Sequence, residues 1–300
     1  MHVFLNLLGS DTMTREYSLA HLTALSLTPP EMVDVAARTG YQYVGLRLNR
    51  ITPTEVLYPL ITDRALMKET KAHLADTDVG VWDIECARMG PDTEPESYLS
   101  FLETGAELGA LHVLAQLPDP DFDRATDRFG RLCDLAKPLG LDVDLEFVSW
   151  TETPDLNRAA DVLHAVDRPN ARILVDTLHF DRSSSILADL RQLPPEWFRY
   201  AQVCDAPKEK PTANEGLLYE GRSERLFPGD GGIDVRGILA CLSQDIPYAL
   251  EIPGDSLAAK VGLEEYARRA LQSSRQHLDR VAGERLARPR SKPQRRKVTT

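Results

Sequence analysis

Four polar residues near the ends of separate apolar runs have the side chains that bind divalent metal ions. Glu146 lies in LDVDLEFV, Asp176 in ILVDTLHF, Gln202 in YAQVCDAP and Glu251 in YALEIPGD. If each run is a strand, alternation turns these side chains to one face and their apolar neighbours to the other. Three carboxylates that converge in an interior repel one another and lose solvation, so they need a cation to be ionised together.

The donor atoms of this set are all oxygens, because Gln202 supplies an amide oxygen. Such hard donors favour Mg²⁺ or Mn²⁺, and they are also compatible with Co²⁺ or Zn²⁺. Coordination positions would remain open for substrate oxygens. The alternative is that these residues are separate structural acids, which cap helices or pair with arginines.

The apolar runs recur at intervals of very roughly 30 residues with helix-like segments between them, which is the rhythm of βα units. Eight such strands close a TIM (β/α)8 barrel, whose active site lies at the C-terminal ends of the strands. The expected strands are Ala20–Leu25, Tyr43–Leu48, Val79–Cys86, Leu111–Leu117, Leu141–Phe147, Arg172–Thr177, Tyr200–Cys204 and Tyr248–Ile252.

Helix starts follow from local signals, with Gly40 as the cap at the end of the first helix. An unusually long Gly- and Pro-rich loop, Ala206–Gly232, follows the seventh strand and is expected to cover or complete the site. Helices are expected to begin after Pro29-Pro30, after Asp121, at Ser184 in SSILADLRQL, after Asp234 and at Ser256, the last running through Val281.

Length and composition indicate one barrel domain. The 300 residues carry a formal net charge of −11, and 42% of them are hydrophobic. We expect an N-terminal extension over residues 1–17, the catalytic barrel over 18–283 and a basic, disordered tail over 284–300. The tail carries seven of the basic residues, so the barrel is more acidic than the whole chain and repels polyanions such as nucleic acid.

The cysteines and the hydropathy pattern indicate a cytoplasmic location. Cys86, Cys133, Cys204 and Cys241 form no C-x-x-C pair and suit reduced thiols. No stretch approaches the ~18 consecutive apolar residues of a membrane span, so no membrane partner is expected.

Several motifs together resemble a known family: the xylose isomerase-like TIM barrels, or sugar phosphate isomerases/epimerases, which include ketose 3-epimerases, inosose dehydratases and 3-dehydroshikimate dehydratases. The resemblance spans Ser18 to Val281. It rests on the Glu of LEF, the D-x-x-H of Asp176 to His179, Gln202 three residues before Asp205, the PGDGGID loop at Pro228–Asp234 and the Glu of LEI.

The resemblance implies that Glu146, Asp176, Gln202 and Glu251 bind one divalent metal ion. It also implies that Glu146 and Glu251 exchange a proton with the substrate, and that His179 contacts the substrate and shuttles protons. The family commonly has His where this chain has Gln202. Some dehydroshikimate dehydratases resemble this chain in carrying Gln there.

Five further residues are expected to bind the substrate. Arg47 points inward in VGLRL, where it would grip a carboxylate or phosphate or else neutralise Glu85 or Asp83. Arg222 and Arg225, in the long loop, would grip an anion or remain solvated. The complete expected set is Arg47, Glu85, Asp205, Arg222 and Arg225.

The leading interpretation is a metal-dependent isomerase or epimerase that acts on a small polyhydroxylated carbonyl compound through a stabilised enediolate. The alternative is a lyase of the 3-dehydroshikimate or inosose dehydratase type, with His179 as the acid. The expected partner is therefore a polyol, a keto-sugar or a cyclic hydroxy-keto acid, and homo-oligomerisation is left open.

Two other functions are compatible with a barrel of this kind, DNA repair and metal-dependent binding without catalysis. Apurinic endonucleases share this barrel but resemble a three-zinc site rich in histidine, whereas His179 alone of the seven histidines here falls among the candidate ligands. A binding barrel that retains its metal but has lost its chemistry would show no solvent exchange with any polyol or keto acid.

Overall fold

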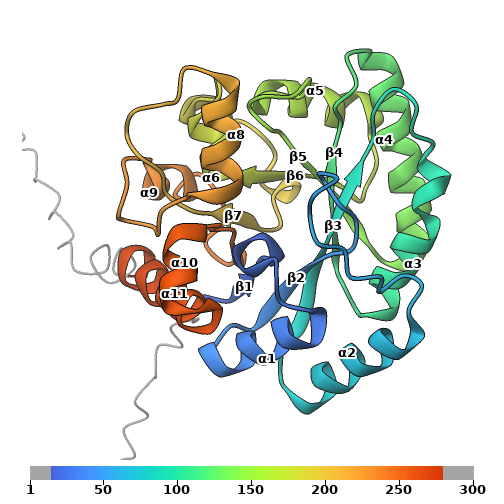
Figure 1. Ribbon diagram of the computed structural model, residues 1–300. Helices are drawn as coiled ribbons and strands as arrows, with labels where there is room; N and C mark the ends of the chain where they lie inside the picture. The colour runs from blue at the N-terminus through green and yellow to red at the C-terminus, as the bar shows by residue number, and fades with distance from the viewer. Residues whose placement is uncertain (1–14, 280–300) are drawn as a thin grey trace, which may run out of the picture.

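The computed structural model describes residues 15–279, which form a closed barrel of eight parallel strands surrounded by helices (Figure 1). The strands pair in chain order, and the last pairs back onto the first. The predicted TIM (β/α)8 barrel is confirmed. Its strands are β1 (Tyr17–Leu19), β2 (Tyr43–Arg47), β3 (Gly80–Arg88), β4 (His112–Gln116), β5 (Asp142–Glu146), β6 (Ala171–Asp176), β7 (Ala201–Val203) and β8 (Tyr248–Leu250).

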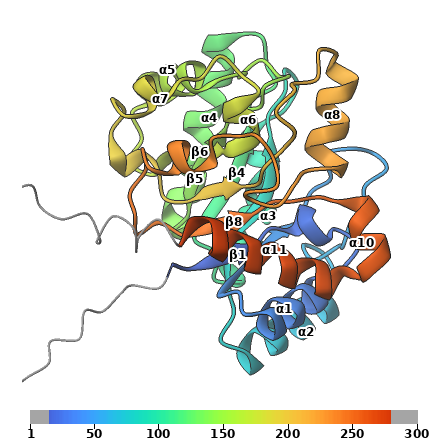
Figure 2. The same ribbon diagram turned by 90° about the vertical axis from the view of Figure 1, so that its left-hand side faces the viewer.

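The helices form a ring outside the strands, and the last long helix packs beside the first (Figure 2). The hydroxyl of Tyr41 donates to the carbonyl oxygen of Ala267 at 2.9 Å, which links the two ends of the ring. The helices are α1 (Pro29–Thr39), α2 (Arg64–Asp76), α3 (Leu99–Glu107), α4 (Phe122–Ala136), α5 (Leu156–Val166), α6 (Thr177–Asp181), α7 (Leu187–Leu190), α8 (Asn214–Ser223), α9 (Val235–Leu239), α10 (Asp255–Val261) and α11 (Leu263–Leu278).

Capping residues define the helix ends as predicted. Thr28 and Glu31 form a reciprocal capping box at the start of α1, and Gly40 ends that helix with a left-handed φ of 94°. The carboxylate of Asp121 accepts from the backbone of α4, and that of Asp234 accepts from α9.

Strand alternation divides the core into two parts. Outward side chains such as Val143 and Val175 join a large apolar layer between the strands and the helices. A smaller cluster fills the barrel interior and includes Trp82, Leu174 and Tyr200. The same alternation places the polar residues of β5 inside the barrel, as the sequence predicts.

Three predicted elements were wrong. Ala20–Leu25 is not the first strand: β1 lies just before it, because Tyr17–Leu19 pairs with both β2 and β8, and the run itself turns into a 3₁₀ helix. The final helix is broken at Gly262, whose φ of 84° is left-handed. The loop Ala206–Gly232 contains α8.

Some predicted regions lie wholly or partly outside the described residues. These are the first fourteen residues of the extension and the basic tail, whereas Tyr17, the last residue of the extension, already belongs to β1. All four cysteines are free thiols, as expected. No helix within residues 15–279 is long and apolar enough to cross a bilayer.

Candidate active site

The four candidate metal ligands lie at the C-terminal end of the barrel, but Glu251 stands outside the close group that Glu146 and Asp176 form with His179. Glu146 and Asp176 end β5 and β6, Gln202 lies beside Asp176 in β7, and Glu251 follows β8. All four are buried. The amide nitrogen of Gln202 donates to Glu251 Oε1 at 3.2 Å. One ligand atom from each of Glu146, Asp176 and His179 lies within 4.8 Å of the others.

Arg225 lies between two of these carboxylates. Its Nη1 is 2.6 Å from Asp176 Oδ2, and its Nη2 is 2.9 Å from Glu251 Oε2. A backbone contact holds the same side chain in place, since Nε donates to the carbonyl oxygen of Gly221 at 2.8 Å. One positive charge is thus already present among the acids. Charge repulsion between them therefore does not by itself require a metal, contrary to the argument from sequence.

The residues nevertheless fit a divalent ion. Among the described residues, Gln202 Oε1 is buried and has no hydrogen-bond partner. Such an orphaned oxygen loses free energy unless a donor or a cation satisfies it. Each carboxylate oxygen also has more than one lone pair, so Asp176 and Glu251 can ligate an ion while they accept from Arg225. Oxygen donors of this kind suit a hard cation.

Two neighbouring carboxyl groups, those of Glu146 and Asp176, differ in pKa because the charges around them differ. Burial and the nearby Asp176 raise the pKa of Glu146 to about 8, although the hydrogen bond from Gln116 acts in the opposite direction. Burial also tends to raise the pKa of Asp176, but Arg225 and His179 hold it below its ordinary value. One acid can therefore carry a proton near neutral pH while its neighbour is ionised.

His179 faces the acids from α6. Asp176 begins that helix by accepting from the backbone nitrogen of Leu178 at 2.7 Å, which places the histidine one turn beyond the strand end. His179 Nε2 lies 3.9 Å from Glu146 Oε1, and the ring packs edge-on against Trp150 with centroids 4.7 Å apart. Burial lowers the pKa of His179 to about 4, so the imidazole is neutral at pH 7.

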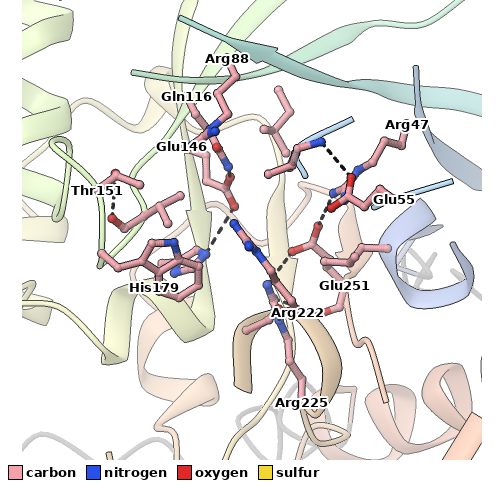
Figure 3. Close-up of a pocket in the computed structure, with 16 residues that line it drawn as sticks. Arg47, Glu55, Arg88, Gln116, Glu146, Thr151, His179, Arg222, Arg225 and Glu251 are labelled. Carbon is pink, nitrogen blue, oxygen red and sulfur yellow. Dashed lines mark hydrogen bonds and ion pairs between the residues drawn. The ribbon is translucent and has the colours of Figure 1, made fainter. Parts of the chain in front are cut away.

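An open pocket lies over these groups. Asp176 and Gln202 are buried behind its wall, whereas Glu146, His179 and Glu251 line it. Figure 3 shows acidic and basic side chains projecting into it from several strands and from α8. The charged and polar side chains of the wall are Arg47, Glu55, Arg88, Gln116, Glu146, Thr151, His179, Arg222, Arg225 and Glu251.

Arg47 lines the cavity but is paired with acids. Its Nη2 lies 2.8 Å from Glu85 Oε2, and weaker ion pairs join it to Glu55 at 3.7 Å and Glu251 at 3.8 Å. The structure therefore has the internal ion pair that the sequence left open as an alternative. Glu85 is fully buried and does not reach the cavity, which corrects its expected place at the substrate.

Asp205 also lies away from the cavity. Its carboxylate accepts from the backbone nitrogens of Gly229, Gly231 and Ile233 at 3.0, 3.1 and 3.0 Å. A side chain at Gly231 would clash, because its Cβ would lie 2.4 Å from Asp205 Oδ1. Instead of contacting the substrate, Asp205 organises the glycine-rich turn that leads into α9.

Several cavity residues were not predicted from the sequence, and Gln116, Arg88 and Trp150 show why. Gln116 donates to Glu146 Oε2 at 2.5 Å, and the alternation rule applied to β4 would have placed it on the interior face. Arg88 was missed because β3 runs two residues beyond the predicted end at Cys86. Trp150 could not be assigned, since a tryptophan after a strand suits a core as well as a pocket.

Comparison with known proteins places this site in a family. A family model described as a xylose isomerase-like TIM barrel matches residues 33–277. The L-ribulose 3-epimerase of Methylomonas sp. (strain DH-1) is 27% identical over 246 residues, which are 75% of this chain and 77% of the relative. The inosose isomerase of Bacillus velezensis is 26% identical over 157 residues, which are 49% of this chain and 54% of that relative.

A dehydratase and a metal-bound structure are also similar to this chain. The 3-dehydroshikimate dehydratase of Pseudomonas aeruginosa is 27% identical over 137 residues, which are 44% of this chain and 21% of the relative. The crystal structure of the IOLI protein with a bound zinc atom superposes with a TM-score of 0.73 at 18% identity, covering 88% of this chain and 98% of that one. This structural likeness bears on the fold.

Proposed function

The chain belongs to the xylose isomerase-like TIM barrel family, and on that premise we propose that it is a divalent-metal-dependent isomerase or epimerase of a small polyhydroxylated carbonyl compound. The observation that carries this proposal is the close approach of Glu146 and Asp176 at the mouth of the barrel. Gln202 lies beside Asp176 in the next strand and bonds to Glu251, and its oxygen is unpaired among the described residues. The names of the relatives, an L-ribulose 3-epimerase and an inosose isomerase, support the same class of substrate.

These four residues would hold the ion, and their donor set favours Mg²⁺ or Mn²⁺. When bound, such an ion supplies Lewis acidity that polarises a substrate carbonyl and acidifies the adjacent C–H bond. A bound ion would also give the buried oxygen of Gln202 a partner. It would add a counter-charge for the three buried carboxyl groups beside Arg225.

Glu146 and Glu251 are the proposed proton carriers. They end strands β5 and β8, three strands apart around the barrel, so they approach the cavity from different sides. Removal of a proton by one carboxylate and its return from the other inverts a carbon centre. Without metal, burial raises the pKa of Glu146 to about 8, whereas a bound cation would favour its ionised form, so Glu146 would begin the reaction as a carboxylate that can remove the proton.

His179 and Gln116 support that transfer. Gln116 donates to one oxygen of Glu146 and leaves the other directed toward the histidine. The imidazole of His179 is neutral and lines the cavity, so it can exchange a proton with a substrate hydroxyl. Trp150 packs against the ring and limits its rotation.

A dehydratase is the second candidate. A substrate with a hydroxyl β to the acidified carbon would lose water if that hydroxyl were protonated as its C–O bond breaks. His179 lines the cavity and is neutral, so it would first have to take up the proton that Glu146, 3.9 Å away, removes from the substrate, and would then pass it to the hydroxyl. The similarity to a 3-dehydroshikimate dehydratase supports it. Elimination and epimerisation share the first proton abstraction and differ only in the fate of the enolate.

One experiment separates the candidates. The protein, loaded with Mn²⁺ or Mg²⁺, is incubated in deuterium oxide with inososes, ketohexoses or 3-dehydroshikimate and followed by NMR and ultraviolet absorption. Deuterium incorporation without a new chromophore indicates epimerisation or isomerisation, whereas a conjugated product indicates dehydration. Activity that persists at full strength after exhaustive chelation, or no exchange with any substrate, would sink the proposal.

A further inference from the structure

Two arginines on the cavity wall lack an anionic partner. Arg88 is the last residue of β3, and Arg222 lies in the last turn of α8. Within residues 15–279, the buried Nε of Arg88 donates to no acceptor, and neither guanidinium lies within ion-pair distance of a carboxylate. In Figure 3 the two side chains enter the cavity from opposite sides.

The other two arginines of the wall differ in this respect. Arg47 is paired with Glu85 at 2.8 Å, and Arg225 is paired with Asp176 and Glu251 at 2.6 and 2.9 Å. Their charges are therefore already neutralised by the protein. An incoming anion would have to compete with buried carboxylates for them, whereas Arg88 and Arg222 remain available.

The electrostatics of Arg222 indicate excess positive charge at this point of the cavity. Burial lowers its pKa, and the positive charges of Arg88 and Arg47 act in the same direction, while Glu55 opposes them without prevailing. Glu55 is itself occupied, because its carboxylate accepts from the backbone of Ile51 at 2.8 Å and lies 3.7 Å from Arg47. Partly buried cations without a counter-charge are unfavourable, and a bound anion would offset that cost.

We propose that Arg88 and Arg222 form an anion subsite for a carboxylate or phosphate group of the substrate. The guanidinium fork matches both groups with paired hydrogen bonds. The inference rests on the proposed function, because the bound anion is taken to belong to a substrate whose reacting carbon reaches Glu146 and Glu251 in the same cavity. It narrows the substrate class to acidic polyhydroxylated carbonyl compounds, such as sugar phosphates or cyclic hydroxy-keto acids.

Calorimetric binding of charged and neutral probes to the metal-loaded full-length protein tests the subsite. D-ribose 5-phosphate is compared with D-ribose for the phosphate, and quinate with myo-inositol for the carboxylate. At least one anionic probe should bind about tenfold or more tightly than its neutral counterpart, as expected for charge-assisted hydrogen bonds. A bound metal ion also attracts anions, so the decisive quantity is the part of this preference that depends on the arginines.

That part is measured with Arg88→Gln, Arg222→Gln and the double variant. The preference should fall to within about twofold in the double variant and return in part in Arg222→Lys, which restores the charge. Arg199→Gln is the matched control, because Arg199 is exposed just before β7, at the opposite end of the barrel. It should bind the probes as the wild type does. Circular dichroism verifies that each variant is folded. If the double variant does not fold, the two single variants are used to measure the preference.

Two results overturn the subsite: equal binding of charged and neutral probes, and a preference that survives in the folded variants. Neither result depends on turnover. Epimerisation of a neutral sugar without any charge preference would leave the proposed function standing and remove the subsite. If the preference depends on the two arginines but the protein exchanges no substrate proton, the subsite stands and the proposed function falls.

Discussion

Arg225 Nη1 lies 2.6 Å from Asp176 Oδ2, and this buried ion pair places a protein cation where the candidate metal site has its carboxylates. The same guanidinium reaches Glu251 at 2.9 Å. In the absence of an ion it is the positive charge closest to both acids. Arg225 and a bound metal ion would therefore stabilise the same two carboxylates.

The stability of an Arg225→Gln variant should depend strongly on metal. Without metal, two buried carboxyl groups lose their counter-charge, and we expect a loss of about 3–5 kcal/mol in the free energy of unfolding. With saturating Mn²⁺ the loss should be clearly smaller, because the ion replaces the missing charge. Urea denaturation with and without a chelator measures both values. Arg222→Gln removes an unpaired arginine nearby and serves as the control, and equal losses in the two conditions would contradict the shared role.

Replacement of Glu146 by Gln should abolish turnover and preserve the fold. Gln keeps the shape of the side chain and can still accept a hydrogen bond, but it cannot carry the proton. We expect a loss on the order of 10²–10⁴-fold in the rate of solvent exchange. Exchange rates and thermal unfolding are measured together. A folded variant that retains more than about a tenth of the activity would count against Glu146 as the proton carrier.

The stability of the metal-free protein should fall with rising pH because of Glu146. Its pKa in the folded protein, about 8, lies above its ordinary value. The native state therefore binds the proton more tightly than the unfolded state does. This contribution is fully present below the ordinary pKa of Glu and is lost as pH rises through about 8. Chelated Glu146→Gln should lose less stability than the wild type over this interval. Parallel curves for the two proteins would contradict the raised pKa.

Metal binding should release protons. Ligation requires ionised carboxylates, and burial raises the pKa values of both Glu146 and Glu251. The affinity for Mn²⁺ should therefore increase between about pH 6 and pH 8, by up to about tenfold per unit for each proton displaced. Calorimetry in buffers of different ionisation enthalpy counts the protons, and Glu146→Gln should release fewer. If the affinity did not change with pH, neither Glu146 nor Glu251 could lose a proton when the ion binds.

Gln116→Leu should shift the pH profile of the reaction and leave the barrel intact. The amide of Gln116 donates to Glu146 at 2.5 Å and favours its ionised form. Without it the pKa of Glu146 should rise further, so the acid limb of the rate profile should move to higher pH. Gln192→Leu, on an exposed surface, is the control. A lower rate with an unmoved profile would indicate a purely structural role for Gln116.

Local sequence determined the barrel and the interior direction of its key side chains. Alternation along a strand depends only on near neighbours, so Glu146, Asp176 and Gln202 could be assigned to the interior without coordinates. Capping chemistry is equally local, which is why the helix end at Gly40 and the helix start at Asp121 were recognisable. The first strand was misplaced because its pairing with β8, far along the chain, decides its position.

Only the tertiary structure decided which charges pair. Asp176 and Arg225 are 49 positions apart, and Arg47 and Glu85 are 38 apart. No local pattern distinguishes such a pair from a free arginine, because ion pairing depends on distances of a few ångströms across the barrel. For the same reason the sequence could not show that Asp205 binds the glycine-rich turn and not the substrate. Nor could it show that Arg88 and Arg222 line the cavity without counter-charges.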